Sequence, residues 1–450
     1  MHNPQDFMYE EFLEHKKIFN MRNKWDYMML SSGTNQFPLP RLWKETIAVE
    51  IDTDFTYQLY VSPFGFDTVN KSLKMYENFI STGGKLTDSS VRNNNVCMTI
   101  GASQAAFLAI EYLFTNKPSS EIYIIGYNYP LYASLSQKRG FSITQIIGKE
   151  NFIPNLSELL EYINNCPSNS VFIFSHPNNP SGEQYTQEEY NKIVLFFKRK
   201  NIFAIFDLAC NLVISNNDQV FIEASINTNN YWSNSVIINS FSKTDSAAGF
   251  RIGYIYGESK IIDYFFHQQA TMLMALPSFP VLAIFFTSLF RCIYLNSKYS
   301  WNNSNLISTF KNIFYITTSI PNKSICDYIE RVFSNVDFFY EKYVEELLCN
   351  ENTIMQNLQY VRYKLKEDIL NISRFKSGFN LMIKHKNLKN LSEIDFVSRI
   401  LKDTGLAIIT ESAFSLEKTK KSDFWFRISL AYPESVFIKS IDKLSVFLQS

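Results

Sequence analysis

One lysine-containing stretch, residues 239–254, constrains this 450-residue chain more than any other feature: Asn-Ser-Phe-Ser-Lys-Thr-Asp-Ser-Ala-Ala-Gly-Phe-Arg-Ile-Gly-Tyr. The apolar run Val236–Ile238 precedes the lysine, and a second apolar run extends from Phe250 to Tyr256. This pattern predicts a buried strand, a tight polar loop and a second strand. Lys243 then lies at the end of a buried strand, where an ammonium group is costly unless it is paired or neutralised by chemistry.

Two interpretations of Lys243 are open at this point. A desolvated lysine is the usual nucleophile for a Schiff base with an aldehyde cofactor, which would neutralise it. Arg251, further along the same stretch, could hold an anion such as a phosphate. Alternatively, the stretch is a surface loop that carries an ordinary lysine and an ordinary arginine.

Composition excludes several classes of protein. With 43 basic and 43 acidic residues the chain has no net charge and no basic stripe, so nucleic acid is not an expected partner. The 46% hydrophobic content excludes a disordered chain, and the length suits two or three domains. The five histidines show no metal-ligand spacing, so no metal is expected.

The lack of a secretory pattern and the scattered cysteines together predict a cytoplasmic protein. The polar, acidic N-terminus has no secretory pattern, and the apolar run Pro280–Phe290 is too short to span a bilayer, so we expect a buried helix there and no membrane partner. Six scattered cysteines without a CxxC pair favour reduced thiols in a reducing compartment.

Strands and helices alternate along residues 96–260, which predicts a doubly wound, mostly parallel sheet. Expected strands cover residues 96–100, 121–126, 170–175, 201–206, 236–238 and 250–256, and later ones 377–383, 405–409 and 424–431. Residues 296–305 are predicted to form a loop, and residues 324–369 a long helix with a break near Asn350.

The lysine stretch resembles the lysine motif of class I/II aminotransferases, which are pyridoxal 5′-phosphate (PLP) enzymes of fold type I. Asn179-Pro-Ser-Gly and Phe-Arg427-Ile-Ser-Leu-Ala resemble two further motifs of that family, and the matches keep their order over about residues 30–432. The resemblance implies an α/β fold: a large domain with a doubly wound, mostly parallel sheet, plus a smaller α+β domain. The expected division is 1–52 (N-terminal part of the small domain), 53–295 (large PLP-binding domain) and 296–450 (C-terminal small domain, with an enlarged helical insertion at about 296–355).

The resemblance also implies how the cofactor is held. Lys243 would form the internal aldimine, and Asp207 would pair with the pyridine nitrogen. Asn179 would bond the phenolic oxygen and would also contact the substrate. Tyr129 would stack on the ring, although core packing also explains an aromatic there. The remaining cofactor contacts are expected to bind or surround the phosphate and the phenolic oxygen: Ala102, Ser103, Gln104, Cys210, Ser240, Ser242 and Arg251. Small residues that open a helix at Gly101 leave backbone N–H groups for an anion, and an ordinary capped turn is the alternative.

Three further residues are implied for the substrate and the partner subunit. Arg427 would hold the substrate α-carboxylate, with a buried structural ion pair as the alternative, and Gly33 would contact the same carboxylate unless its loop is a plain turn. Tyr60 would reach the phosphate of the neighbouring subunit in a homodimer, and Tyr57 is close enough in sequence to compete. The implied activity is transfer of an amino group from an amino acid to a 2-oxo acid.

The chain also departs from the family pattern. Cys210 replaces the usual tyrosine, and a thiol is a weak hydrogen-bond donor. Asp245-Ser246 replaces the common Phe-Gly after Ser-Lys-Thr, and the Pro-Gly after residue 409 is lost. These departures keep open a PLP-dependent cyclase, eliminase or oxidase of specialised metabolism, and Ser31-Ser-Gly33 resembles the capreomycidine synthase branch. A non-catalytic binding protein on the same fold is a third possibility.

Overall fold

The computed structural model describes residues 3–19, 27–31, 33–53, 60–85, 91, 93–215, 219–272, 276–278, 280–297, 303–318, 323–367, 369–386, 391–417 and 424–449. Two compact units make up the chain, and each is built from separate stretches of sequence. Unit 1 contains Met1–Phe37, Lys117–Gln184 and Asn350–Ser450, and unit 2 contains Pro38–Asn116 and Tyr185–Cys349. The domain boundaries expected after residues 52 and 295 stay a prediction.

The larger sheet has seven strands in the order β1-β7-β6-β5-β4-β2-β3. Its strands are β1 (Asn94–Ile100), β2 (Ile122–Ile125), β3 (Ile143–Ile146), β4 (Val171–Ser175), β5 (Phe203–Asp207), β6 (Ser235–Ser240) and β7 (Ile252–Glu258). The pairs β2/β3, β2/β4 and β5/β6 are parallel, and β7 runs antiparallel to β1 and β6. This mixed, mostly parallel sheet with its helices confirms the predicted α/β fold class.

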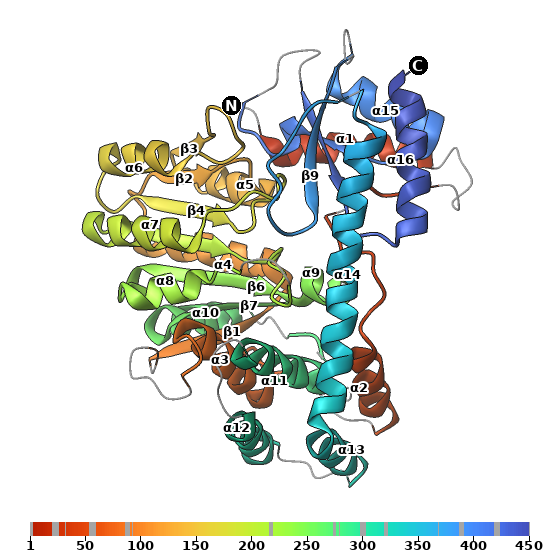
Figure 1. The fold of residues 1–450 in the computed structure, drawn as a ribbon. Coiled ribbons are helices and arrows are strands. Elements are labelled where there is room, and N and C mark those ends of the chain that lie inside the picture. Colours follow the sequence, from red (N-terminus) through yellow and green to blue (C-terminus); the bar gives the residue numbers. More distant parts are fainter. Residues whose placement is uncertain are drawn as a thin grey trace. The chain divides into compact units, whose positions relative to one another are not determined.

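Unit 2 surrounds its strands with helices (Figure 1). Helices α4 and α10 pack together against β1 and β7, whereas α3 packs against β1, α8 and α11. The helices are α2 (Arg41–Asp52), α3 (Asp67–Ser81), α4 (Gly101–Asn116), α7 (Gln187–Lys200), α8 (Ile222–Thr228), α9 (Phe241–Thr244), α10 (Ser259–Thr271), α11 (Val281–Ser297), α12 (Asn303–Thr317) and α13 (Lys323–Ser334). The predicted buried helix at 280–290 is therefore α11, which is buried along nearly its whole length.

Local sequence sets both ends of helix α7. Thr186 and Glu189 form a capping box at the start of α7, acidic residues occupy its first turn and basic residues its last turn, and Asn201 ends it in the left-handed conformation. The chain then enters β5, whose residues are all buried. This sharp helix end leads directly into the strand that carries Asp207.

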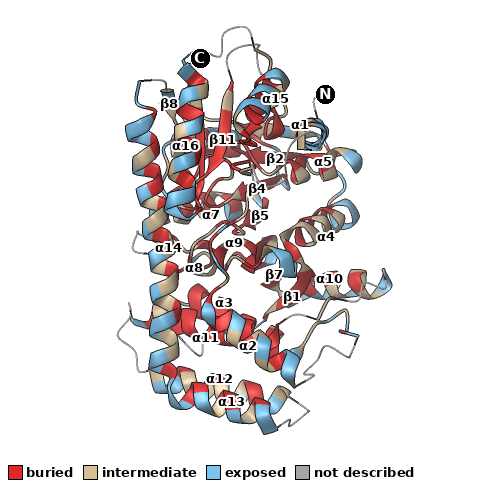
Figure 2. Cartoon of the chain, turned by 90° about the vertical axis from the view of Figure 1, so that its right-hand side faces the viewer, coloured by how far each residue is buried: buried red, intermediate tan, exposed pale blue. Residues whose placement is uncertain are grey.

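Unit 1 contains a second, antiparallel sheet in the order β10-β11-β9-β8. Its strands are β8 (Ile369–Ile372), β9 (Asn380–His385), β10 (Ile409–Thr410) and β11 (Trp425–Ser429), and the helices of the unit are α1 (Pro4–Phe19), α5 (Pro130–Lys138), α6 (Leu156–Asn165), α15 (Glu393–Thr404) and α16 (Glu434–Gln449). Helix α1 docks on this sheet through the buried carboxylate of Glu11, which accepts a hydrogen bond from the Thr410 N–H (3.1 Å). Figure 2 shows the central strand β11 in red, the colour of buried residues.

The predicted break near Asn350 is wrong. Helix α14 (Val336–Lys364) is continuous through that position, and the chain breaks instead at Asn335, between α13 and α14. Buried residues recur along α14 at helical spacing: Tyr343, Leu347, Glu351, Ile354, Leu358 and Val361. One buried stripe, apolar except for Glu351, therefore passes the polar positions around Asn350 and keeps the helix intact. The predicted loop at 296–305 is also shorter than expected, because α11 extends to Ser297 and α12 begins at Asn303, and residues 298–302 lie outside the described part of the chain.

In the described residues, no helix combines the length and the apolar character that crossing a membrane requires. The six cysteines, all within the described ranges, form no disulfide.

Candidate active site

The Lys243 turn lies where β6 ends. Strand β6 finishes at Ser240, the single helical turn α9 carries Lys243, and a short 3-10 turn leads through Arg251 into β7. The side chains of Phe241, Ser242 and Thr244 are buried, whereas Lys243 is half-buried. The predicted order of strand, tight polar turn and strand is thus confirmed.

Asp207 lies at the same edge of the sheet as this turn. Strands β5 and β6 are parallel neighbours, with Asp207 in register with Ile238, so both strands end at one edge. The Asp207 side chain is only 7% exposed, and its Oδ1 accepts a hydrogen bond from the Ala209 N–H at 2.9 Å. Cys210 follows in the same loop and is also buried. A buried carboxylate at this edge can stabilise a positive charge on a ligand held beside it.

A cationic corner forms where α4 begins. Gly101 has a positive φ of 71°, and a Cβ added there would lie 2.7 Å from Arg251 Nη2, so only glycine lets the guanidinium approach the N-terminus of α4. Gly253 lets the backbone of β7 approach the start of α4, because an added Cβ would lie 2.4 Å from the backbone carbon of Gly101. Two glycines therefore bring Arg251 against the N-terminal turn of α4, where backbone N–H groups and the helix dipole favour an anion.

Four other predicted phosphate contacts lie at this helix start and at the end of β6. Ala102 and Ser103 lie in the first turn of α4, and the Gln104 side-chain oxygen accepts a hydrogen bond from the Ile100 N–H at 2.6 Å. Ser240 is 2% exposed, and its Oγ is a buried polar atom without a hydrogen-bond partner among the described residues. A buried hydroxyl of this kind, together with Arg251 and the start of α4, fits the oxygens of a phosphate group.

In unit 1, Arg427 is the centre of a second cluster. It lies in β11, paired with Ile409 of β10 and Met382 of β9, and is 5% exposed. Its Nη1 donates to Asn179 Oδ1 at 2.8 Å, its Nη2 donates to the Ser31 carbonyl, and its guanidinium lies 5.0 Å from the centre of the Phe414 ring. Two oxygens and an aromatic face therefore orient this guanidinium, the side-chain group whose two parallel donors match a carboxylate ligand.

Asn179 and Gly33 both adjoin that guanidinium. Asn380 Nδ2 also donates to Asn179 Oδ1 (3.3 Å), so the amide oxygen of Asn179 is occupied and its NH₂ group is the part that can donate to a ligand. A Cβ on Gly33 would lie 3.3 Å from Arg427 Nη2. The structure therefore brings together Gly33, Asn179 and Arg427, all three of the predicted substrate-binding residues.

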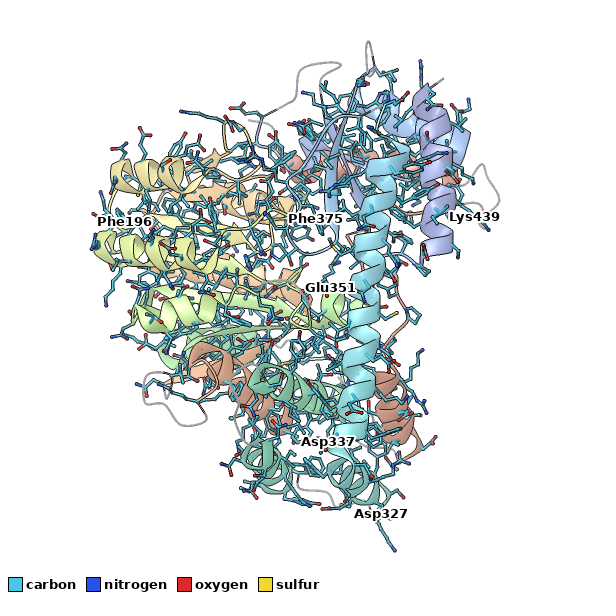
Figure 3. The ribbon with its side chains drawn as sticks, viewed as in Figure 1. Phe196, Asp327, Asp337, Glu351, Phe375 and Lys439 are labelled. Carbon is cyan, nitrogen blue, oxygen red and sulfur yellow. The ribbon has the colours of Figure 1, made fainter. Side chains whose placement is uncertain are left out.

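The loop that carries Asn179 is held by close packing. Gly182 has a φ of 72°, and a Cβ there would lie 2.5 Å from the ring of Phe375, which is labelled in Figure 3. The neighbouring Asn178 donates to the Tyr127 carbonyl at 2.8 Å and accepts from the Ser181 hydroxyl at 2.9 Å. These contacts explain why the Asn-Pro-Ser-Gly sequence forms one defined loop.

Two predicted tyrosines take different positions. Tyr129 is half-buried and immediately precedes Pro130, the first residue of α5. Tyr60 is 96% exposed, and Tyr57, its competitor, lies outside the described residues. Exposure of Tyr60 agrees with a role outside its own subunit and leaves that role a prediction.

Sequence reasoning missed residues that act through the predicted ones. Asn380 donates to Asn179, and the Ser31 carbonyl and the Phe414 ring contact Arg427, each from a different segment of unit 1. Asp245, for which sequence offered no account, points into the core of unit 2 and pairs with Arg291. A charged residue at a position that is usually apolar was the signal for that ion pair.

Solved aminotransferases share this mostly parallel sheet and the helices packed on it. The fold is therefore fold type I. The aromatic aminotransferase from Pyrococcus horikoshii superposes with a TM-score of 0.68 at 18% identity, covering 97% of this chain and 98% of that one. An aspartate aminotransferase from Thermotoga maritima superposes with a TM-score of 0.66 at 20% identity, covering 98% and 96%.

The family follows from the sequence comparison. Residues 26–289, more than half of the chain, match the model of aminotransferase class I and II, and the chain belongs to that family. An aspartate aminotransferase from Sulfurisphaera tokodaii is 28% identical over 239 residues, 52% of this chain and 56% of the relative. A probable N-acetyl-LL-diaminopimelate aminotransferase from Bacillus subtilis is 20% identical over 94% of this chain and 89% of its own length. The matches to aspartate aminotransferases from five organisms span between 55% and 65% of those proteins.

Proposed function

We propose that this protein is a PLP-dependent aminotransferase that moves an amino group from an amino acid to a 2-oxo acid. The cationic corner carries the proposal: Arg251 against Gly101 at the start of α4, with the buried Ser240 hydroxyl nearby in the same unit. This corner suits a phosphate, and Lys243 and Asp207 occupy the strand ends of the same sheet edge. Membership of the aminotransferase family and the names of the relatives support the assignment.

PLP, when bound, would supply an aldehyde for Lys243 and a ring that accepts electrons from the substrate. The phosphate would be held by Arg251, Ser240 and the first N–H groups of α4. Asp207 would keep the ring nitrogen protonated, and the Asn179 amide NH₂ would donate to the phenolic oxygen. Ser242, Tyr129 and Cys210 complete the proposed contacts.

For the substrate, Arg427 would bind the α-carboxylate with Gly33 beside it, because a guanidinium offers two parallel donors to a carboxylate. The Lys243 amine, once released, would remove the α-proton and return a proton, acting as general base and then as general acid. We also propose a cytoplasmic homodimer in which Tyr60 serves the partner's site. Free metabolites, an amino acid and a 2-oxo acid, would be its other partners.

The visible absorption spectrum of the purified protein with added PLP tests this function. We expect a yellow band that one amino acid in a panel bleaches while one equivalent of its 2-oxo acid forms, and that Lys243→Ala abolishes. Reduction with borohydride should attach the cofactor mass to the peptide that contains Lys243.

The alternatives predict other outcomes. A spectral change without a matching 2-oxo acid would favour a cyclase, eliminase or oxidase and contradict transamination. No band with added PLP and no mass on Lys243 would contradict the cofactor assignment itself.

A further inference from the structure

Asp245 occupies an unusual place, two residues after Lys243 and fully buried. Its Oδ2 forms an ion pair with Arg291 and accepts a hydrogen bond from the Thr244 hydroxyl at 2.6 Å. Its Oδ1 accepts a hydrogen bond from the Tyr343 hydroxyl at 2.6 Å. Both carboxylate oxygens are therefore engaged within unit 2.

Arg291, from α11, contacts the lysine turn on both sides of Lys243. Its Nη2 donates to Thr244 Oγ1 at 2.9 Å as well as pairing with Asp245. Its guanidinium also lies 5.1 Å from the centre of the Phe241 ring, at the first residue of α9. One buried cation thus contacts positions 241, 244 and 245 of the turn.

The turn depends on such contacts for its shape. Helix α9 has four residues, and a single helical turn is unfavourable by itself because nucleation fixes several dihedral angles for one hydrogen bond. Arg291 and Tyr343 belong to α11 and α14, which are long helices. A buried ion pair often stabilises a core no more than apolar residues of the same volume would. Its directional hydrogen bonds, however, hold the groups that make them in one geometry.

We propose that Asp245 is a positioning residue for Lys243. Together with Arg291 and Tyr343 it fixes the turn so that the Lys243 amine is presented in one place. This proposal rests on the proposed role of Lys243, and it assigns a function to the Asp-Ser departure from the family motif. Asp245 does not itself touch the reacting atoms.

Tyr343→Phe is the sharpest test, because it removes one hydroxyl and leaves the Asp245–Arg291 pair in place. Tyr256→Phe is the matched control: its buried hydroxyl accepts from Asn94 Nδ2 (2.9 Å) and donates to Asn78 (2.7 Å), and none of these residues is in the turn. In the protein without cofactor, we expect faster amide exchange at residues 241–250 in Tyr343→Phe than in Tyr256→Phe.

With PLP bound, Tyr343→Phe should shift the pH midpoint of the visible band. It should also lower kcat roughly 10- to 100-fold with little change in KM for the amino acid, since small misplacements of a reacting group cost about that much. Asp245→Asn should show the same changes more strongly. Equal exchange, midpoint and kcat in the two tyrosine variants would overturn the proposal. If borohydride reduction attaches no cofactor mass to Lys243 in the wild-type protein, the proposed function is contradicted, and this proposal is contradicted with it.

Discussion

At the scale of single residues, Arg427 is a buried charged group with defined partners. Arg427 is held by oxygens of Asn179 and Ser31 and by the face of Phe414. These partners fix the plane of the guanidinium, and the planar guanidinium of an arginine matches the two oxygens of a carboxylate ligand.

Arg427→Lys keeps the positive charge but removes the two parallel N–H donors of the guanidinium. We expect KM for the amino donor to rise about 10- to 100-fold, because a lysine cannot make two parallel bonds to a carboxylate and no longer holds Asn179. Steady-state kinetics would measure this change. Arg374→Lys is the control, since Arg374 is largely exposed and its pairing with Glu150 is long at 3.7 Å. Equal KM values in both variants would contradict the role of Arg427.

Two buried carboxyl groups predict how stability depends on pH. Burial raises the pKa of Glu77 to about 7, against the effects of the Tyr254 hydroxyl, Arg291 and Asn239. Burial, and then the charge of Glu77, raises the pKa of Glu223 to about 8. Both pKa values exceed the ordinary 4.5, so the folded protein retains protons that the unfolded chain loses.

The contribution of these two groups to the unfolding free energy is therefore fully present below about pH 4.5, and it is lost as the pH rises through about 7 to 8. We expect Tm to fall over this range and Glu223→Gln to flatten the fall, because a glutamine cannot ionise. Calorimetry at several pH values would measure the slopes, with the exposed Glu188→Gln as control. An equally steep fall in wild type and Glu223→Gln would refute this account.

At the scale of elements, the site depends on how closely β7 and the start of α4 approach. The element types were largely readable from sequence, because the apolar runs of β1, β2, β4, β5, β6 and β7 are bounded by turn residues. Strand β3 was not, since residues 143–146 are only partly buried and their apolar pattern is weak. The break predicted at Asn350 failed because the apolar stripe of α14 continues through polar positions.

Gly253→Ala tests the approach of β7 to α4. The added methyl group would lie 2.4 Å from the Gly101 carbon and 2.6 Å from the Ala102 nitrogen, both backbone atoms that cannot swing aside. We expect a loss of about 1–3 kcal/mol in unfolding free energy, together with weaker PLP binding. Urea denaturation and cofactor titration would measure both quantities.

Gly249→Ala, four positions earlier in the same motif, is the matched control. A methyl group there would meet nothing within 4 Å, and Gly249 has no positive φ. Its unfolding free energy and PLP affinity should stay close to those of wild type. If the two alanine variants behave alike, the close approach at Gly253 does not matter for the cofactor corner.

At the scale of the whole molecule, we predict that a second copy of the chain completes the site. Tyr60 is 96% exposed, which suits a side chain that acts outside its own subunit. We therefore expect Lys243→Ala and Tyr60→Ala, each weak or inactive alone, to regain activity when they are unfolded and refolded together. A hybrid dimer would contain one site with both an intact Lys243 and an intact Tyr60.

The measurement is the activity of the refolded mixture against the sum of the two variants refolded separately. Lys243→Ala refolded with Arg427→Lys is a control, because both of these residues are proposed to act within one subunit. Activity no higher than the sum for the Tyr60 mixture would contradict a shared site.

The sequence by itself determined the family, the α/β class and the identity of the residues proposed for the site, because these depend on short motifs and on local apolar patterns. Only the tertiary structure decided which groups meet. Arg427 and Asn179 are separated by 248 positions, and Asp245 and Tyr343 by 98. No local propensity encodes such pairs, since they form when separate elements pack into one core. The same packing explains Asp245, which differs from the family motif, because it brings Arg291 and Tyr343 against its buried carboxylate next to the lysine turn.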